Sequence, residues 1–372
     1  MSDSIPLSAP EIGAREEELV LEVLRSGRLS LGPMGGRFER ELAAWLGCED
    51  AVAVSSGTSA LHLGVRQLGW GAGDEVLTSP FSFVASANCL LYEGARPVFC
   101  DVDPLTLNLD PEAAAAAAGE RTAGILPVHI FGYPAAMAEL ERLAETRGLG
   151  ILEDACEALG AVDSDGRRVG TRGNLATFAF YANKQMTTGE GGMIVPTGAA
   201  AERLRSERNQ GRAVDMGWLD HDRLGYNYRL SDLAAALGVA QVEQLDSILA
   251  RREAVAGLYE EGLAGVGGVA TPTPGRGSER RSWFVYPVRL DPAIDRDATI
   301  AALAERGIAS KAYLPCIHLF PHLRELGWRE GQFPVAEAAA AESLALPFFT
   351  SLGEGEVERV CQELAAVLGQ RA

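Results

Sequence analysis

The sequence is poor in cysteine and in basic side chains. Its six cysteines form no Cys-x-x-Cys pair, which argues against a disulfide framework or a structural zinc site and favours a reducing cytoplasm. No other spacing typical of metal ligands appears, so no metal is expected. The 33 Lys and Arg residues against 51 Asp and Glu residues give a net charge of −18. Nonspecific nucleic-acid binding needs a basic face, so nucleic acid is not an expected partner.

A long apolar run is also missing. No run approaches the roughly 20 residues needed to cross a bilayer, so no membrane contact is expected. Residues 1–18 are acidic and polar and lack the basic and apolar regions of a signal peptide. The chain has 372 residues, which is long for one hydrophobic core, so two domains are expected.

Short β-rich runs alternate with amphipathic helical stretches in the first part of the chain. Seven such runs occur, at 51–56, 75–80, 96–102, 124–131, 150–155, 175–181 and 191–196. Continuous apolar strands that alternate with helices predict an α/β fold with a mainly parallel sheet covered on both faces. Ligands of such sheets gather at the carboxyl ends of the strands, so polar residues just after each run deserve the closest look.

A different pattern begins near residue 231. Residues 231–263 predict one or two long helices with Ser231 as N-cap, and the Gly- and Pro-rich segment 265–282 predicts a loop. A strand at 283–290, a helix, a strand near 308–314 and a helix near 354–369 complete a smaller α+β domain. We expect a large domain at 1–245 and a small domain at 246–372.

Four strand ends carry residues that suggest a ligand site. Gly57 and Thr58 follow the first run and open a helix, where backbone N–H groups favour a phosphate, although an ordinary N-cap has the same pattern. Phe83 follows the second run and suits either ring stacking or core packing.

The other two strand ends carry charge. Glu153 and Asp154 end an apolar strand, and strand alternation points them to opposite faces, so one of them enters a site or both are solvated. Lys184 also ends a strand. A lysine in a partly dry site has a lowered pKa and is nucleophilic, whereas one on a flexible glycine loop is simply exposed.

Together these residues match the needs of pyridoxal 5'-phosphate (PLP). This cofactor forms a Schiff base with a lysine, places its pyridinium nitrogen against a carboxylate, and needs a cradle for its phosphate. The sequence therefore predicts a PLP site built from the loops of one sheet.

The chain resembles the DegT/DnrJ/StrS family of PLP-dependent sugar aminotransferases. The resemblance covers nearly the whole chain. The motifs that carry it are "VSSGTSALHLG", "LPVHIFGYPA", "EDACEALGA", "NKQMTTGEGG", "LGYNYRLSDLAAALG" and "AYLPCIHL". It implies PLP-dependent transferase fold type I, a mainly parallel seven-stranded sheet, and PLP or its amine form PMP as cofactor.

The resemblance also implies roles for single residues. Lys184 would hold the cofactor and shuttle protons, and Asp154 would pair with the pyridinium nitrogen. Phe83 would stack on the ring, and Gly57 and Thr58 would bind the phosphate. Asn227 would reach the cofactor phosphate of a neighbouring subunit, which implies a homodimer with shared active sites. Arg229 is a further candidate for the same region, or a structural residue.

Two positions depart from the family pattern. Many members have serine as a phosphate ligand where this chain has Ala179, so the cradle must use other donors, such as Asn183. Many members have Gln or His near the phenolic oxygen of the ring where this chain has Glu157. Two anionic oxygens in contact would repel, so Glu157 is expected to be protonated when the cofactor is bound or turned away from the ring.

The resemblance suggests a reaction and its substrates. Lys184 favours transamination over the family's dehydratase branch, which carries histidine there, and "TTGEGG" resembles members that aminate the sugar C4 position. We expect transfer of an amino group from glutamate (or glutamine) to a keto sugar on a nucleotide diphosphate. The alternatives are a keto-cyclitol, a 3-keto sugar nucleotide or a PLP-binding regulator without catalysis. Candidate substrate contacts, each with a structural alternative, are Arg212, Arg229, Lys311, Tyr313 and His318.

Overall fold

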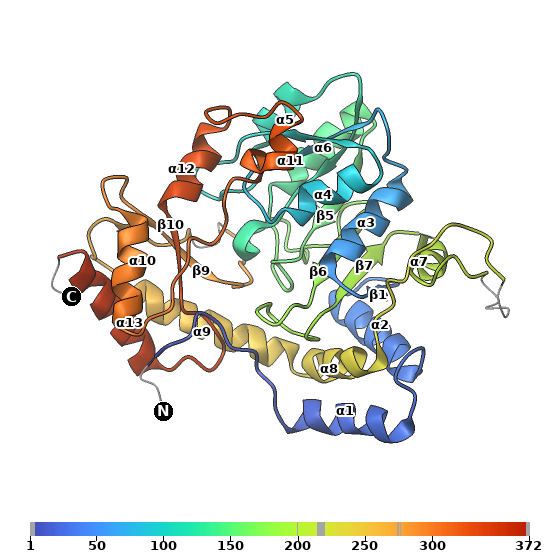
Figure 1. The fold of residues 1–372 in the computed structure, drawn as a ribbon, viewed down its shortest axis with the longest axis horizontal. Coiled ribbons are helices and arrows are strands. Elements are labelled where there is room, and N and C mark those ends of the chain that lie inside the picture. Colours follow the sequence, from blue (N-terminus) through green and yellow to red (C-terminus); the bar gives the residue numbers. More distant parts are fainter. Residues whose placement is uncertain (1–3, 199, 214–219, 274, 276, 370–372) are drawn as a thin grey trace.

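A seven-stranded sheet organises most of the chain, and a separate three-stranded sheet lies beside it (Figure 1). The computed structural model describes residues 4–198, 200–213, 220–273, 275 and 277–369. The strands of the large sheet are β1 (Val52–Val54), β2 (Glu75–Thr78), β3 (Arg96–Phe99), β4 (Thr122–Leu126), β5 (Gly150–Asp154), β6 (Leu175–Ala179) and β7 (Gly192–Pro196). Their order across the sheet is β1-β7-β6-β5-β4-β2-β3.

β7 runs in the direction opposite to the other six strands of this sheet. It pairs antiparallel with β1 and β6, whereas β2, β3, β4, β5 and β6 pair in parallel. The seven predicted strands and the mainly parallel sheet are thereby confirmed. The carboxyl ends of the parallel strands meet at one edge, which brings together the residues that follow β2, β5 and β6.

Helices cover both faces of the large sheet because successive strand residues point to opposite sides. Val52, Val54 and Leu152 pack in one cluster with α3 and α4, whereas Ala53 packs with α2 and α8, and Ile151 packs with α6. The helices of this part are α1 (Ala14–Ser26), α2 (Pro33–Leu46), α3 (Gly57–Leu68), α4 (Ala85–Tyr92), α5 (Pro111–Ala117), the 3-10 helix η1 (Ile130–Gly132), α6 (Met137–Arg147), α7 (Ala200–Arg208) and α8 (Asp232–Glu243).

The small sheet has the order β10-β9-β8 and is antiparallel throughout. Its strands are β8 (Val269–Ala270), β9 (Tyr286–Leu290) and β10 (Ser343–Leu346), and the helices of this part are α9 (Leu245–Gly262), α10 (Arg296–Glu305), η2 (Ile317–Leu319), α11 (Pro321–Arg324), α12 (Pro334–Glu342) and α13 (Glu354–Val367). The strand predicted near 308–314 is wrong. That segment makes only isolated bridges, Ile308 to Ile5 and Lys311 to Ala345, and the strand that pairs with β9 is β10.

Two segments cross between the parts of the chain. Ile5 packs in the hydrophobic cluster of the small sheet, and Leu323 and Phe333 pack against Phe99 in a cluster of the large sheet. The long predicted helix is two helices, α8 and α9, bent by 67° at Gln244, and Ser231 caps α8 by accepting from the Ala234 N–H. We propose this break as the domain boundary. Among the described helices none alone is long and apolar enough to cross a membrane, although the bent α8–α9 pair meets that length and composition.

Gly132 offers a test of how tightly η1 packs against the loop before β9. It has φ +79°, and a Cβ there would lie 1.7 Å from the Ser282 carbonyl oxygen. Gly148 has a similar φ of +67° with open space around it, so it is a matched control. We expect Gly148→Ala to cost about 1–2 kcal/mol through backbone strain alone. Gly132→Ala should cost about 3 kcal/mol or more because the clash with backbone adds to that strain.

The measurement is denaturant unfolding of the cofactor-free protein, read by far-UV circular dichroism. Equal losses of stability in the two variants would show that η1 moves freely away from Ser282 and would contradict the close packing.

Candidate active site

The two carboxylates at the end of β5 have separate environments. Asp154 is 5% exposed; its Oδ2 accepts from the Ser86 hydroxyl at 2.8 Å and its Oδ1 from the Cys156 N–H at 3.2 Å. Glu153 points to the other face and is fully buried. It accepts from His129 and from the backbone N–H groups of the segment 170–173. Only Asp154 is therefore available to a ligand.

Hydrogen bonding keeps Glu153 ionised. Burial opposes the charged form, but the hydrogen bond with His129 and the backbone donors outweigh it, so the pKa of Glu153 is lowered. His129 Nδ1 in turn accepts from the Ala135 N–H at 2.9 Å. His129 thus packs and hydrogen-bonds at a strand end.

Lys184 lies in the turn after β6, and its side chain is 13% exposed. Its Nζ is 3.7 Å from Glu157 Oε1 and 3.9 Å from the centre of the Phe284 ring. The lysine is thus in a largely dry site with one carboxylate and one aromatic face as neighbours. Desolvation and a cation–π contact are the surroundings in which an amine can be held for reaction with a carbonyl group.

Glu157 is the third ionisable group of this cluster. It is 6% exposed, and its Oε2 accepts from the Phe131 N–H at 2.9 Å. Burial raises the pKa of Glu157, nearby Asp154 adds to that rise, and Lys184 opposes it. Phe131 has φ +52°, a conformation that non-glycine residues rarely adopt, within a turn that directs its N–H to the carboxylate. The carboxylate therefore faces Lys184.

The start of α3 forms the proposed phosphate cradle. Ser56 caps the helix by accepting from the Ser59 N–H at 3.0 Å. A methyl group on Gly57 would lie 2.7 Å from Ala179 Cβ and 3.1 Å from Cys156 Sγ, so only glycine lets the helix start approach the ends of β5 and β6 this closely. Within the described chain, no acceptor is recorded for the N–H groups of Gly57 and Thr58. These donors fit an anion.

The glycines after Lys184 have a packing role. A Cβ on Gly191 would lie 2.2 Å from Thr188 Oγ1, and one on Gly192 would lie 2.4 Å from the Ser56 carbonyl oxygen. Gly192 thus lets β7 pass directly beside the start of α3. The turn also bonds to itself, because Thr188 donates to the Glu190 carbonyl at 2.8 Å. The glycine-rich turn holds the lysine loop and the phosphate cradle in register.

Phe83 and Asn183 lie at the border of the cluster. Phe83 is 61% exposed, and its carbonyl oxygen lies 3.1 Å from the oxygen of Ser86, the hydroxyl whose proton Asp154 accepts. Asn183 donates to the Tyr313 hydroxyl at 3.0 Å, and its buried Oδ1 has no partner among the described residues. Burial raises the pKa of Tyr313, so the phenol stays neutral. An unused acceptor and an exposed ring both leave contacts open to a ligand.

The other predicted substrate residues are less closely tied to Lys184. Arg229 donates to Asn209 at 3.0 Å and to Gln210 at 3.2 Å, so its contacts here are those of a structural residue. Asn227 and Lys311 are exposed, and Arg212 is half-buried. No contact recorded for the described chain joins any of these four residues to the Lys184 cluster.

His318 has a packing environment. It is fully buried against Phe333, with its Nε2 3.2 Å from Glu337, and burial lowers its pKa. No part of it is accessible to a substrate. The structural alternative therefore describes the contacts of His318, because the η2–α11 segment folds back onto the large sheet.

Three neighbours of the site were missed by the sequence reasoning. Ser86 anchors Asp154, Phe284 covers Lys184, and the Phe131 N–H binds Glu157. Ser86 could have been recognised from the sequence, since it is one of three serines in the segment 79–86 that follows β2. Phe284 comes from the small-sheet part of the chain and Phe131 acts through its backbone, so no local pattern marks either.

These residues fit PLP by their chemistry. Asp154 uses one neutral donor on each oxygen, which leaves lone pairs for a pyridinium N–H. Helix-start N–H groups suit the phosphate, Phe83 offers a ring face, and Lys184 offers an amine. Among the described residues no group of His, Cys, Asp and Glu suited to a metal ion is found.

Comparisons with known proteins agree with this arrangement. Residues 10–365 match the model of the DegT/DnrJ/EryC1/StrS aminotransferase family. The chain is 37% identical over 380 residues to GDP-perosamine synthase of Caulobacter vibrioides, covering 99% of this chain and 100% of that protein.

Solved structures show the same fold. The aminotransferase TlmJ from Streptoalloteichus hindustanus matches with a TM-score of 0.92 and 36% identity, over 98% of this chain and 99% of that one. The PLP form of the putative sugar aminotransferase Spr1654 from Streptococcus pneumoniae matches with a TM-score of 0.93 and 27% identity, over 98% of both chains. The expected fold type, enzyme class and cofactor are confirmed. The chain belongs to the DegT/DnrJ/EryC1/StrS aminotransferase family and is a PLP-dependent aminotransferase.

Proposed function

We propose that this enzyme transfers an amino group from glutamate (or glutamine) to the C4 keto group of a deoxy sugar carried by a nucleotide diphosphate. The observation that carries the proposal is the full-length similarity to GDP-perosamine synthase, together with the "TTGEGG" turn after Lys184. That turn packs against the start of α3, so its sequence bears directly on the shape of the site.

Each residue of the cluster has a task in this reaction. Bound PLP supplies an electron sink for charge that develops on the amino-bearing carbon. Asp154, fixed by Ser86, holds a proton on the pyridine nitrogen. Lys184 holds the cofactor and carries protons at Nζ, while Phe284 and Glu157 limit its motion. Phe83 covers one ring face, and the N–H groups of α3 bind the phosphate.

Substrate recognition is assigned to the open side of the cluster. We assign Tyr313 to the sugar because its hydroxyl meets Asn183, and we assign the exposed Lys311 and the loop residues Arg212 and Arg229 to the diphosphate. His318 is left out because it is buried. The six cysteines are free thiols, which is consistent with a reducing cytoplasm as the location of the enzyme.

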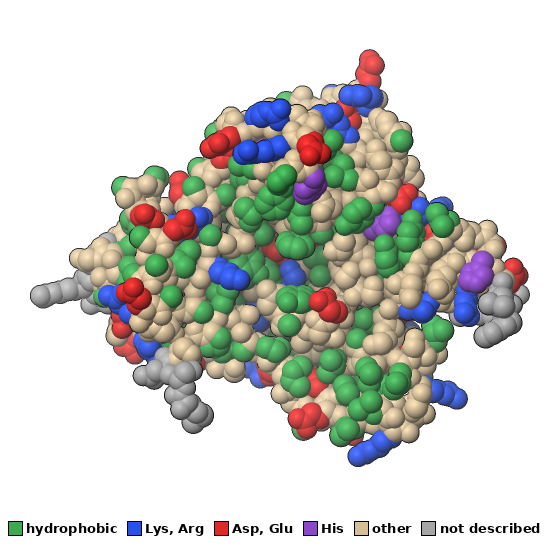
Figure 2. All heavy atoms as spheres, viewed as in Figure 1, with side chains coloured by type: hydrophobic (Ala, Val, Ile, Leu, Met, Phe, Trp, Pro, Cys, Tyr) green, Lys and Arg blue, Asp and Glu red, His purple; other side chains and the backbone are tan. Residues whose placement is uncertain are grey.

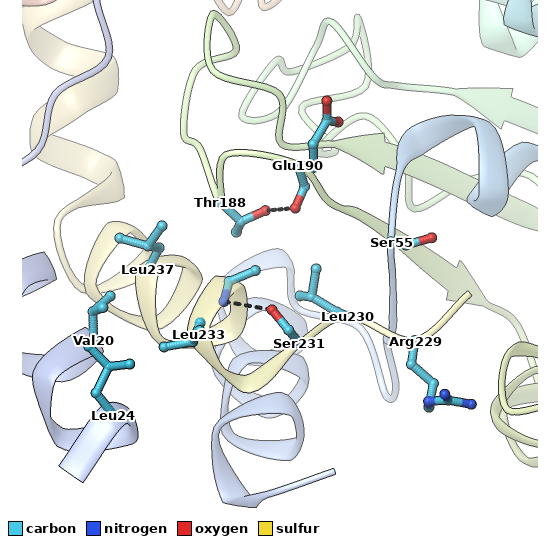
Figure 3. Close-up of a pocket in the computed structure, with 11 residues that line it drawn as sticks. Val20, Leu24, Ser55, Thr188, Glu190, Arg229, Leu230, Ser231, Leu233 and Leu237 are labelled. Carbon is cyan, nitrogen blue, oxygen red and sulfur yellow. Dashed lines mark hydrogen bonds between the residues drawn. The ribbon is translucent and has the colours of Figure 1, made fainter. Parts of the chain in front are cut away.

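A homodimer with shared sites completes the proposal. Asn227 is exposed, while its neighbours Tyr226 and Tyr228 stack together with ring centres 5.0 Å apart. The loop therefore turns Asn227 outward. Arg229, two residues on, lines an open groove of about 540 Å³ between α1 and α8, and Figure 3 shows Val20, Leu24, Leu233 and Leu237 along its walls. Figure 2 shows apolar side chains gathered over the same helices, and Leu24 is 50% exposed.

The substrate assignment is tested by the second half-reaction alone. The enzyme is first converted with glutamate, freed of excess donor and mixed with a panel of 4-keto and 3-keto nucleotide sugars and keto-cyclitols. The return of the PLP absorbance band should occur with a 4-keto nucleotide sugar. Return only with a 3-keto sugar or a keto-cyclitol would replace the proposed substrate by that compound. Ping-pong kinetics should accompany the productive pair.

Lys184→Ala tests the identity of the cofactor-bound lysine. We expect this variant to lose the covalent PLP absorbance and at least about 1,000-fold in kcat, because nucleophile and proton carrier disappear together. Lys311→Ala is a matched control, because it removes an exposed lysine outside the Lys184 cluster. It should keep the absorbance band and change only the KM of the nucleotide sugar. A normal band in Lys184→Ala would show that another lysine holds the cofactor.

Mixed dimers test whether Asn227 serves the partner's site. Lys184→Ala and Asn227→Ala are each expected to be weakly active alone. If Asn227 reaches across, hybrid dimers contain one intact site, and random mixing should restore about a quarter of wild-type activity. If Asn227 acts within its own subunit, mixing restores nothing. The activity of hybrid dimers, purified by means of a different tag on each subunit, measures this directly.

A further inference from the structure

Glu157 is the ionisable residue of the site to which the family pattern gives no role. Its Oε2 is held by the Phe131 N–H at 2.9 Å, whereas Lys184 Nζ, 3.7 Å away, is the only partner recorded for Oε1 among the described residues. The charged and titratable groups that face it are Lys184 after β6, Asp154 at the end of β5 and Tyr313 before η2. Its carboxylate is thus stabilised by one cation and one N–H group.

We propose that Glu157 is the proton acceptor of Lys184, taking the lysine's ammonium proton when Lys184 binds the PLP carbonyl and returning it when that bond opens. This inference rests on the proposed function and deepens it. In the forward step, Nζ forms a C=N bond to the carbonyl carbon, and the carbonyl oxygen leaves as water. The proton that Nζ carried as an ammonium group moves to Glu157, so atoms and charge balance.

Charge compensation is the reason that the proton stays in the site. Once Lys184 loses its positive charge, Oε1 of Glu157 would be a buried anionic oxygen without a donor. Asp154 beside it keeps two neutral donors and must remain ionised to hold the pyridinium proton. The pyridinium compensates the charge of Asp154 and leaves none for Glu157, so Glu157, the less well hydrogen-bonded carboxylate, is neutralised.

The geometry excludes the alternative in which Glu157 turns away. The Phe131 N–H that fixes Oε2 belongs to a turn with φ +52°. That turn is itself tied down, because the Gly132 carbonyl accepts from the Ser282 N–H at 2.9 Å and Gly132 has no room for a side chain. Rotation of Glu157 would leave the Phe131 N–H buried and unpaired.

Infrared difference spectroscopy tests the proposal directly. Spectra of the protein with and without PLP are compared in H2O and D2O. The expected result is a new carboxylic-acid C=O band on PLP binding that shifts in D2O, with loss of a carboxylate band. PMP has no carbonyl group, so Lys184 keeps its proton and no such band should appear with PMP. Glu157→Gln should lack the band, and Glu145→Gln, on an exposed part of α6, should retain it.

Each other result overturns the proposal. A band with both cofactor forms means that Glu157 is protonated regardless of Lys184, and a band with neither means that the lysine proton goes elsewhere. A band that survives in Glu157→Gln belongs to another residue. If Glu157→Gln failed to bind PLP, the PLP-versus-PMP comparison in the wild-type enzyme would still decide.

The same samples separate this proposal from the proposed function. PLP binding is read from its visible absorbance, and donor use from the loss of that absorbance with glutamate. An enzyme that binds PLP and reacts with glutamate but shows no carboxylic-acid band keeps its function and loses the role given to Glu157. An enzyme that shows the band but never reacts with any keto nucleotide sugar keeps the proton acceptor and loses the substrate.

Discussion

The site depends on placing three ionisable groups in a nearly dry space. Lys184, Asp154 and Glu157 are each about nine-tenths buried, and burial penalises every charged form. Each group has different compensating neighbours. Asp154 accepts from Ser86 and a backbone N–H, and Glu157 accepts from the Phe131 N–H and faces Lys184. Lys184 lies between Glu157 and the Phe284 ring. The unequal hydrogen bonding of the two carboxylates suits them to the different tasks proposed for them.

The rest of the fold serves to hold these compensating groups. β5 delivers Asp154 to the sheet edge, and the fully bonded Glu153 on the opposite face anchors the same strand end. β6 delivers Lys184, and Gly192 in β7 lets the neighbouring strand pass beside the start of α3. Phe284 and Tyr313 come from the small-sheet part of the chain. The site therefore depends on both parts of the chain being docked.

Local sequence patterns predicted the strands because each was a short apolar run bounded by polar residues. Lys184 and Asp154 were predicted as site residues because they end or closely follow such runs, and alternation correctly separated Asp154 from Glu153. The segment near 308–314 was mispredicted as a strand because β9 pairs instead with β10, which comes later in the chain. For His318 the sequence left substrate contact and packing open for a similar reason, since its burial depends on α11 and α12 folding back onto Phe99. Long-range packing of this kind leaves no local pattern.

The two departures from the family pattern have a common physical consequence. Ala179 supplies no hydroxyl to the cradle, and its methyl group instead packs where Gly57 has no side chain. In the proposed site, phosphate binding would then depend more on backbone N–H groups, whose partial positive charge is fixed and cannot titrate. Glu157 adds a negative charge at the other end of the site. With fewer neutral donors near the phosphate and one more acid near Lys184, the site must retain the lysine's proton when the lysine gives up its charge. Glu157 is the group placed to hold it.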